Sequence, residues 1–309
     1  MFASEFLWGG GLMSLRVPSA RNVPWKTEGW VRVSVAMETK TFGGARSSIQ
    51  IDAALADLAA GLRLWRIWTM LGWTDIRQRY RRSFIGPFWI SISMSVMVGG
   101  MGLVYGTLFK QDLTSFLPFL AAGFLGWFFI STCISDGTTV FVHAEGLIKQ
   151  GGLPLSLHVF RAVWRNFLTL LHNLVVIVGI YLWFGNFNLL SFLQVIPGLA
   201  LAIVNLAWML TILGPLCTRY RDLSPIVANT MQMLFFITPV VFKPGAVAAI
   251  AWIVTWNPLY YLLEAIRAPL LGEGLSPALV GLLVLEGVLG WLAAIVFFAR
   301  IRRRIAFWI

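Results

Sequence analysis

The sequence predicts an all-α integral membrane protein with six transmembrane helices, and three observations support this fold class. Of its 309 residues, 58% are hydrophobic and 12% are charged, whereas soluble domains carry about 25% charged residues. The apolar residues gather in runs of about 20, each long enough to cross a hydrocarbon core of about 30 Å. Lys and Arg residues form short clusters at the ends of these runs, where topology signals are found. The expected spans of the transmembrane domain, residues 87–309, lie near residues 87–109, 117–142, 160–184, 192–216, 225–242 and 277–299.

Residues 1–50 precede the apolar runs, and we expect them to be loosely ordered. They mix Gly, Ser, Arg and Trp with no sustained period, and they lack the basic, apolar and small-residue order of a cleavable signal peptide. The stretch from Met37 resembles an ordinary start of a coding sequence, so translation from Met37 instead of Met1 stays an alternative.

Residues 51–86 are predicted to form a cytoplasmic amphipathic interface helix. Apolar residues recur at three- and four-residue steps from Leu55 to Ile76, with Asp and Arg residues between them. A Trp- and Leu-rich face beside Arg residues is typical of a helix in the lipid headgroup region, and the Arg cluster of residues 77–82 suits an anionic leaflet. A soluble helix packed on a core is the alternative.

The segments that flank the spans differ in their content of Lys and Arg, which predicts the orientation of the chain. One side has only Lys110, Lys243 and Arg267. The other side has Arg63, Arg66, Arg77, Arg79, Arg81, Arg82, Lys149, Arg161, Arg165, Arg219, Arg221, Arg300, Arg302, Arg303 and Arg304. Because positively charged loops stay in the cytoplasm, we expect both termini to be cytoplasmic. The net charge of +11 is thereby explained without nucleic acid, which we do not expect as a partner.

The extracytoplasmic segment between spans five and six contains a second apolar stretch, Ala246–Trp256, which is too short to cross a membrane. Asn257 and Pro258 follow it, and a second amphipathic run extends from Tyr260 to Leu271. This pattern predicts a re-entrant periplasmic helical pair, which is tolerated only where protein shields the backbone. A soluble cap is the alternative.

The sequence lacks the residue patterns of an enzyme. His143, His158 and His172 form no metal-binding pair with an acidic third ligand, and no G-x-S-x-G motif is present. Cys133 and Cys217 are too few for a metal cluster or a disulfide framework. No lysine lies in a G-x-x-x-x-G-K-[ST] motif, so energy from ATP has to come from a partner. We therefore expect no catalytic residues, no metal site and no cofactor in this chain.

Several residues are candidates for lining a substrate path. Ser91, Ser95 and Gly99 begin a stripe of small residues on the first span, for which tight helix packing is the alternative. Glu286 lies near the middle of the last span, where an ionisable group is costly and either pairs with another helix or serves transport. Aromatic rings stack on sugars, although most aromatics near span ends form interfacial belts. The remaining candidates are Trp89, Asn229, Gln232 and Phe236.

The loop between spans two and three is a candidate docking element. It begins with polar residues at Glu145 and is interrupted by Gly151, Gly152 and Pro154, which predicts a small helix followed by a turn. A simple connecting loop with topogenic charge is the alternative.

The chain from about Leu62 to Ile309 resembles the membrane subunits of type-2 ABC exporters, especially those for O-antigen, capsular polysaccharide or teichoic acid. Four ordered motifs carry the resemblance. They are Asp75-Ile76 with Arg79–Ser83, Gly86-Pro87 and Trp89; Gly126–Phe129; Leu147–Lys149 with Pro154; and Tyr220–Leu223 with Gln232, Phe235, Phe236, Thr238–Val240, Asn257, Pro258 and Arg267.

The resemblance implies a homodimer with two copies of a separate cytoplasmic ATPase, which binds ATP and Mg, in the bacterial inner membrane. The channel forms between protomers, largely from spans one and five, and the substrate is usually a glycan on an undecaprenyl-diphosphate carrier. The N-terminal 50 residues are longer than the family pattern and have no assigned role. The residues that would couple the chain to the ATPase are Glu145, Gly146, Leu147, Ile148, Lys149, Gln150, Asp75, Arg79, Arg81 and Arg82.

Two other functions stay open. One is an ABC exporter of a drug or lipid with the same fold, and the other is a membrane transferase acting on lipid-linked sugars. The absence of a catalytic cluster disfavours the transferase. A neighbouring gene for an ATPase, with glycosyltransferase genes beyond it, would favour glycan export over drug export.

Overall fold

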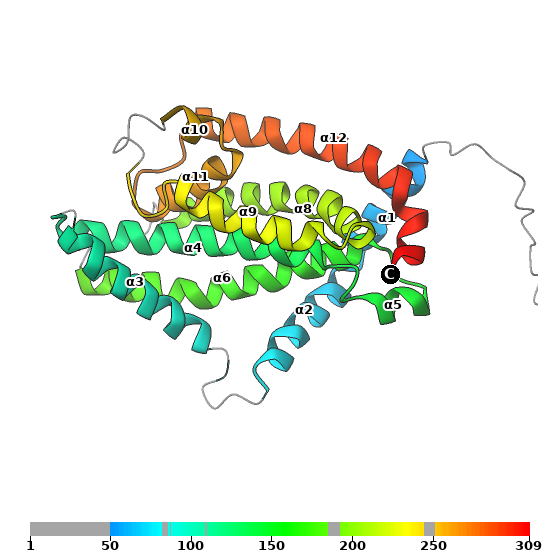
Figure 1. The fold of residues 1–309 in the computed structure, drawn as a ribbon, viewed down its shortest axis with the longest axis horizontal. Helices are drawn as coiled ribbons and strands as arrows, with labels where there is room; N and C mark the ends of the chain where they lie inside the picture. Colours follow the sequence, from blue (N-terminus) through cyan, green and yellow to red (C-terminus); the bar gives the residue numbers. More distant parts are fainter. Residues whose placement is uncertain (1–49, 82–85, 87, 109, 185–191, 244–250) are drawn as a thin grey trace, which may run out of the picture. The chain divides into compact units, whose positions relative to one another are not determined.

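The chain is described from a computed structural model, which covers residues 50–81, 86, 88–108, 110–184, 192–243 and 251–309 (Figure 1). Every regular element within these ranges is a helix, so the predicted all-helical class is confirmed for them. The N-terminal segment that was expected to be loosely ordered lies outside the described residues, except for Gln50.

Five helices of the described part are long and apolar enough to cross a membrane. They correspond to the first four expected spans and to the sixth. These helices are α3 (Phe88–Leu108), α4 (Leu113–Thr138), α6 (Ser156–Phe184), α8 (Val195–Arg219) and α12 (Pro277–Trp308).

Two of these helices begin four residues before their predicted starts at 117 and 160, because side chains cap them. The carboxylate of Asp112 accepts a hydrogen bond from the backbone N–H of Thr114, which starts α4 at Leu113. Asp57, about one hundred residues upstream, accepts from the N–H of Ser156 over 3.0 Å and starts α6 there. The last helix extends past the predicted end at 299 to Trp308, because its Arg-rich end packs on the helix that begins at Ile51.

The fifth expected span, 225–242, is a shorter helix than predicted. Helix α9 (Leu223–Ile237) has 15 residues and a length of about 22 Å, so residues 238–242 are wrongly predicted as helical. The helix ends because Thr238 takes an extended conformation (ψ 133°), as the residue before a proline tends to do. The count of six spans stays a prediction.

The prediction of one continuous helix over residues 51–86 is wrong, since the structure has two helices within residues 51–79, while their role at an interface stays a prediction. Helix α1 (Ile51–Arg63) and helix α2 (Trp65–Arg79) meet at Leu64, whose ψ of 32° interrupts the helix. Neither Gly nor Pro causes the break. Helix α1 packs on α6 and α12, whereas α2 packs mainly along α6, so the chain changes direction between two sets of contacts.

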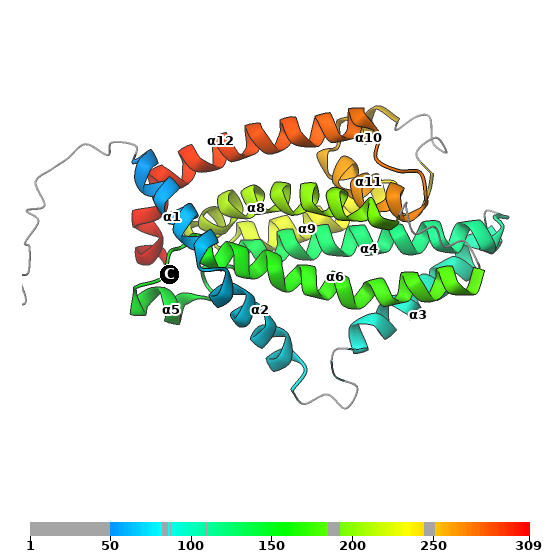
Figure 2. The same ribbon diagram turned by 180° about the vertical axis from the view of Figure 1, so that it is seen from behind.

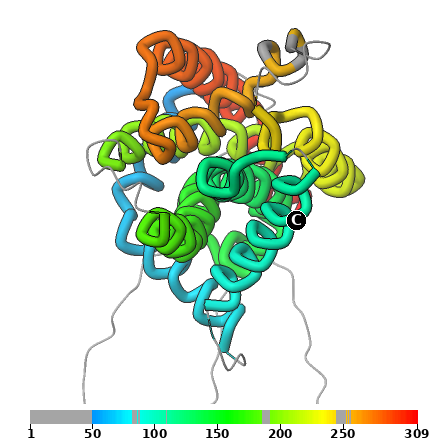
Figure 3. The backbone as a smooth tube through the Cα atoms, turned by 90° about the vertical axis from the view of Figure 1, so that its left-hand side faces the viewer, coloured from blue at the N-terminus to red at the C-terminus, as the bar shows by residue number. Residues whose placement is uncertain are grey.

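Helix α4 forms the centre of the described fold. It packs against α3, α6, α8 and α9, and Figure 3 shows it among them. Most of its residues are buried, including Leu120, Phe124 and Ile130. The flanking helices α3 and α9 each bury only one narrow side, and most of their apolar side chains are exposed or only partly buried.

The two ends of the helix bundle carry different short elements (Figure 1). Helix α1, the short helix α5 (Glu145–Gln150) and the end of α12 lie at one end. Helices α10 (Ala251–Trp256) and α11 (Pro258–Leu270) lie at the other end, at the positions of the predicted re-entrant pair. The start of that predicted pair, residues 246–250, lies outside the described residues. Its entry into the membrane stays a prediction.

Candidate functional site

The short helix α5 presents its charged side chains to solvent. None of its residues is buried, and Lys149 forms an ion pair with Glu145 one turn earlier. The hydrogen bond from Lys149 and its positive charge hold the pKa of Glu145 below its usual value. Gly151 (φ 74°) and Gly152 (φ 87°) then end the helix in a conformation that favours glycine. The six expected coupling residues of this loop therefore lie on one short helix, on which Leu147 and Ile148 are partly buried and the other four are exposed.

The coupling residue expected at Asp75 lies in a charged network between α2, α4 and α6. Arg161 binds the carboxylate of Asp75 through two nitrogen atoms, and Arg165 Nη1 lies 3.4 Å from the same carboxylate. Arg165 Nη2 also donates to Asp136 Oδ2 over 2.7 Å, and Asn166 donates to that oxygen over 3.0 Å. Sequence reasoning did not find these pairs. The available signal was the presence of two Asp and two Arg residues close to otherwise apolar segments.

The other basic residues expected to contact the ATPase lie beyond this network. Arg79 and Arg81 are exposed, and Arg82 lies outside the described residues.

A second polar cluster, also absent from the predictions, joins α1 to α6 and α12. The buried carboxylate of Asp57 accepts hydrogen bonds from the N–H groups of Leu155 and Ser156, at 3.3 and 3.0 Å. Ser156 Oγ donates back to the carbonyl of Asp57, and Arg302 Nη2 lies 3.5 Å from its carboxylate. The first and last helices of the described chain therefore meet at one carboxylate.

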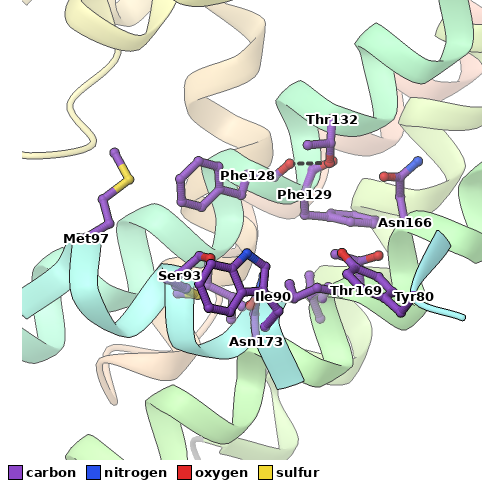
Figure 4. Close-up of a pocket in the computed structure, with 14 residues that line it drawn as sticks. Tyr80, Ile90, Ser93, Met97, Phe128, Phe129, Thr132, Asn166, Thr169 and Asn173 are labelled. Atoms are coloured by element: carbon purple, nitrogen blue, oxygen red, sulfur yellow. Dashed lines mark hydrogen bonds between the residues drawn. The ribbon is translucent and has the colours of Figure 1, made fainter. Parts of the chain in front are cut away.

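A cavity of about 300 Å³ lies between α3, α4 and α6 (Figure 4). Trp89, one of the expected path residues, lines it together with Phe128, Phe129 and Asn173. Asn173 is 6% exposed, and its Oδ1 atom has no hydrogen-bond partner among the described residues. The cavity combines aromatic rings with amide and hydroxyl groups, which is a lining compatible with a partly polar ligand.

The stripe of small residues expected on the first span divides between two environments. Ser91 Oγ donates to the carbonyl of His172 in α6 over 2.6 Å, which is a packing contact. Ser95 is exposed and donates to the carbonyl of Ser91, while Gly99 has open space around it. Gly102, further along α3, packs so closely on Leu117 of α4 that a side chain there would overlap.

The expected path residues of α9 share an exposed side of that helix. Asn229, Gln232 and Phe236 are all exposed, at the three- and four-residue spacing of one helical face. Met231 is the only buried residue that α9 has, and it lies on the opposite side. The ring of Phe235 stacks with that of Phe124 at 5.8 Å and so holds α9 against α4.

The expected path residue of the last span, Glu286, is half-buried in α12. Its Oε1 atom is buried and has no hydrogen-bond partner among the described residues. The structure does not bring Glu286 together with the α9 residues through a described contact. The predicted pairing with a second helix is likewise not seen among the described contacts.

At the end of the helix bundle opposite α5, polar contacts hold α11 in place. Arg267, which is 1% exposed, pairs with Glu264, donates to the carbonyl of Pro239 and lies 4.8 Å from the ring centre of Phe119. Asn257 Nδ2 donates to Thr238 Oγ1 over 2.8 Å. These contacts give a structural role to the Thr238–Pro239 and Asn257 motifs.

The described residues contain no group of three or more His, Cys, Asp or Glu side chains that could hold a metal ion. Cys133 and Cys217 are both buried as free thiols.

Known proteins with similar sequences match about three quarters of this chain. A family model described as ABC-2 type transporter matches residues 67–271. The O-antigen export system permease protein RfbA of Myxococcus xanthus is 24% identical over 232 residues, which cover 73% of this chain and 89% of that protein. A protein of the same name from Klebsiella pneumoniae is 24% identical over 238 residues, covering 75% and 90%. Since the family match covers well over half of the sequence, the chain belongs to the ABC-2 type transporter family.

Proposed function

We propose that this chain is the membrane subunit of an ABC transporter that exports a polysaccharide, such as an O-antigen, carried on undecaprenyl diphosphate. Two copies of the chain would form the channel, and two copies of a separate ATPase would bind ATP and Mg and drive it. The substrate class rests on the O-antigen export permeases, to which the chain is similar over about nine tenths of their length.

The exposed side of α9 is the observation that carries a transport function. Lipid is a poor environment for the amide groups of Asn229 and Gln232, because a polar side chain without partners is costly there. A partner protomer or a water-filled path would satisfy both amides. Phe236, one turn further on, would offer a ring on which a sugar can stack.

Helices α3 and α9 supply the surface for such a dimer. They lie on two sides of the buried α4, and each leaves most of its length uncovered in the single chain. On α3, Ser95 is exposed and Gly99 has open space around it within the described fold, so neither residue would block the approach of a second helix. Small residues at such positions allow two membrane helices to come close together.

The end of the bundle with α5 would face the cytoplasm and the ATPase. The Arg residues at the ends of α8 and α12 and Lys149 of α5 lie at this end, which suits the positive-inside rule. We expect α5 to dock on the ATPase, and Arg79 and Arg81 at the far end of α2 to make a second, separate contact with it. Asp75 would contribute indirectly, by holding α2 on α6, because its carboxylate already binds Arg161 and Arg165.

Deletion of the gene in its own bacterium tests this function. Lipid-linked polymer is expected to accumulate inside the cell while surface glycan disappears, and the intact gene should restore both. Complementation with Asn229→Leu/Gln232→Leu should fail although the variant reaches the membrane in normal amount. Met233→Leu, which changes an apolar residue on the same exposed side, is the matched control and should restore export. Normal surface glycan in the deletion strain would refute the proposal.

A further inference from the structure

An apolar groove of about 650 Å³ is lined by residues of α1, α2, α6, α8 and α12. Figure 2 shows these helices from the side on which α9 lies behind them. Helix α1 runs from the end of α12 toward the start of α6 on this side, and Leu58 and Leu62 form one side of the groove. Trp164 and Phe167 of α6 form a second side, and Trp291 of α12 contributes to the third. None of the lining residues is charged. The volume lies within the range of about 300–1,000 Å³ that is typical of ligand pockets.

Aromatic rings give one wall of the groove a defined shape. Trp68 of α2 makes an edge-on contact with Trp164, with 5.8 Å between ring centroids, and Trp164 lies 5.3 Å from Phe167. Gly72 permits this approach of α2 to α6, since a Cβ atom there would lie 2.8 Å from the Trp164 ring. The wall is therefore built by the packing of α2 on α6.

Two hydrogen-bond donors in this wall lack acceptors. The Nε1 atoms of Trp68 and Trp164 are buried, and no described residue accepts a hydrogen bond from either. The third indole of the groove differs, because Trp291 Nε1 donates to the carbonyl of Val204 over 3.2 Å. A buried N–H group without an acceptor is costly, so an acceptor supplied by a ligand would stabilise this site.

We propose that the groove binds a glycerophospholipid of the bilayer. An acyl chain fills the apolar space, and the ester carbonyl oxygens at its head accept hydrogen bonds from Trp68 and Trp164. Arg63 and Arg66, which are exposed next to Leu62, are placed to attract the phosphate. Ester carbonyls suit neutral indole donors. A diphosphate head at the same depth would need cations, and the lining has none.

The bound lipid would join the N-terminal helices to the spans. Helices α1 and α2 contact α6 directly, and the groove separates Leu58 and Trp68 from Ile203 and Val204 of α8. A lipid in this position completes the packing of the interface helices without closing the α9 face that export requires.

Native mass spectrometry of the full chain with its ATPase, extracted in detergent and titrated with phosphatidylglycerol, tests the site. We expect one tightly bound phospholipid per protomer. Trp68→Phe/Trp164→Phe keeps both rings and removes both donors, so phosphatidylglycerol should bind about tenfold more weakly. Trp291→Phe is the matched control, because its indole already has an acceptor, and it should bind as the unchanged protein does. Equal binding by the double variant and the control would overturn the proposal.

A second measurement keeps the test decisive if a variant does not fold. Phosphatidylglycerol with a photoreactive acyl chain should label peptides of α6 and α8 in the unchanged protein, and Val204→Trp, which fills the groove, should abolish that labelling. Labelling confined to α9, or copurification of a polyisoprenyl lipid in place of a phospholipid, would contradict the proposal. Neither result depends on whether the exported substrate is a polysaccharide.

Discussion

Arg165 Nη2 donates to Asp136 Oδ2 over 2.7 Å and thereby joins the third predicted span to the second. The same guanidinium reaches Asp75, so α2 is connected to α4 through one side chain of α6. If α2 were displaced by the proposed ATPase, the displacement would therefore reach the central helix of the fold directly.

Replacing Arg165 by Met should loosen this connection. It leaves Asp136 with Asn166 as its remaining described partner, and partial exposure of both charged side chains limits the expected loss to about 1–3 kcal/mol. The apparent unfolding temperature in detergent should fall. Arg165→Met/Asp136→Leu should recover part of the loss, because no charge is then left unpaired. Arg77→Gln, on the exposed side of α2, serves as control. A double variant less stable than either single variant would contradict this role.

Replacing Asp57 by Ala should fray the start of α6. The N–H groups of Leu155 and Ser156 lose their acceptor, and loss of such a cap costs about 1–2 kcal/mol. Limited proteolysis should then cut faster near residue 155. Asp57→Asn retains one acceptor oxygen and should have a smaller effect. Asp52 lies in the exposed first turn of α1, the helix that also carries Asp57, so Asp52→Ala should leave the cleavage rate unchanged.

Replacing Gly198 by Ala should separate α8 from α11. A Cβ atom at this position would overlap the backbone carbonyl of Ala265, which cannot rotate away as a side chain could. We expect a destabilisation of about 1–3 kcal/mol and a lower yield of monodisperse protein in size-exclusion chromatography. Gly281→Ala, which has open space around it in α12, should give a normal yield. Equal yields for the two variants would show that the close approach is not required.

Cysteine cross-linking should detect the α9 surface in a dimer. A mild oxidant applied to membranes should link two copies of the chain when Cys replaces Asn229, Gln232 or Phe236 in turn. The native Cys133 and Cys217 are buried, so background reaction should be low. Met231 lies on the opposite side of α9, so Met231→Cys should give no cross-linked dimer. If none of the three exposed positions formed a cross-linked dimer, α9 would not lie at the interface.

Changing the charges of α5 should affect the ATPase and leave the fold intact. Lys149→Glu is expected to reduce binding of the ATPase, measured by co-purification, without changing thermal stability, because both side chains of the ion pair are exposed. Glu145→Lys/Lys149→Glu restores the pair but reverses its direction, so binding should stay weak. The lowered pKa of Glu145 keeps its carboxylate charged at neutral pH. Its ion pair with Lys149 should be lost only as the pH falls through that lowered pKa. Full binding by the charge-swapped variant would indicate that α5 makes no direct contact.

The long helices could be predicted because the length of an apolar run depends on local sequence. Helix α5 was also predictable, since Gly151 and Gly152 end it with positive φ angles. The break at Leu64 was not, because it depends on which distant helices pack on either side of it. The starts of α4 and α6 show the same difference: Asp112 is close in sequence to the helix that it caps, whereas Asp57 lies about one hundred residues from Ser156.

Candidate site residues could be chosen by type but not by surroundings. Asp75 and Arg79 both follow the pattern of a docking helix, yet only the fold reveals that Asp75 already binds two Arg residues while Arg79 is exposed. The indoles of Trp68 and Trp164, which have no acceptor among the described residues, could not be found from sequence either, since an N–H group lacks an acceptor only in a particular packing.

The carboxylate shared by α1, α6 and α12 also bears on how the protein is made. Asp57 leaves the ribosome 245 residues before Arg302, so a nascent chain carries this carboxylate without its cation until synthesis is nearly complete. A chain that terminates early keeps the charge of Asp57 without its cation and lacks the contacts of Arg302 that hold α1. Truncated products would thus expose their first helix to membrane proteases, and only a finished polypeptide would be protected from degradation.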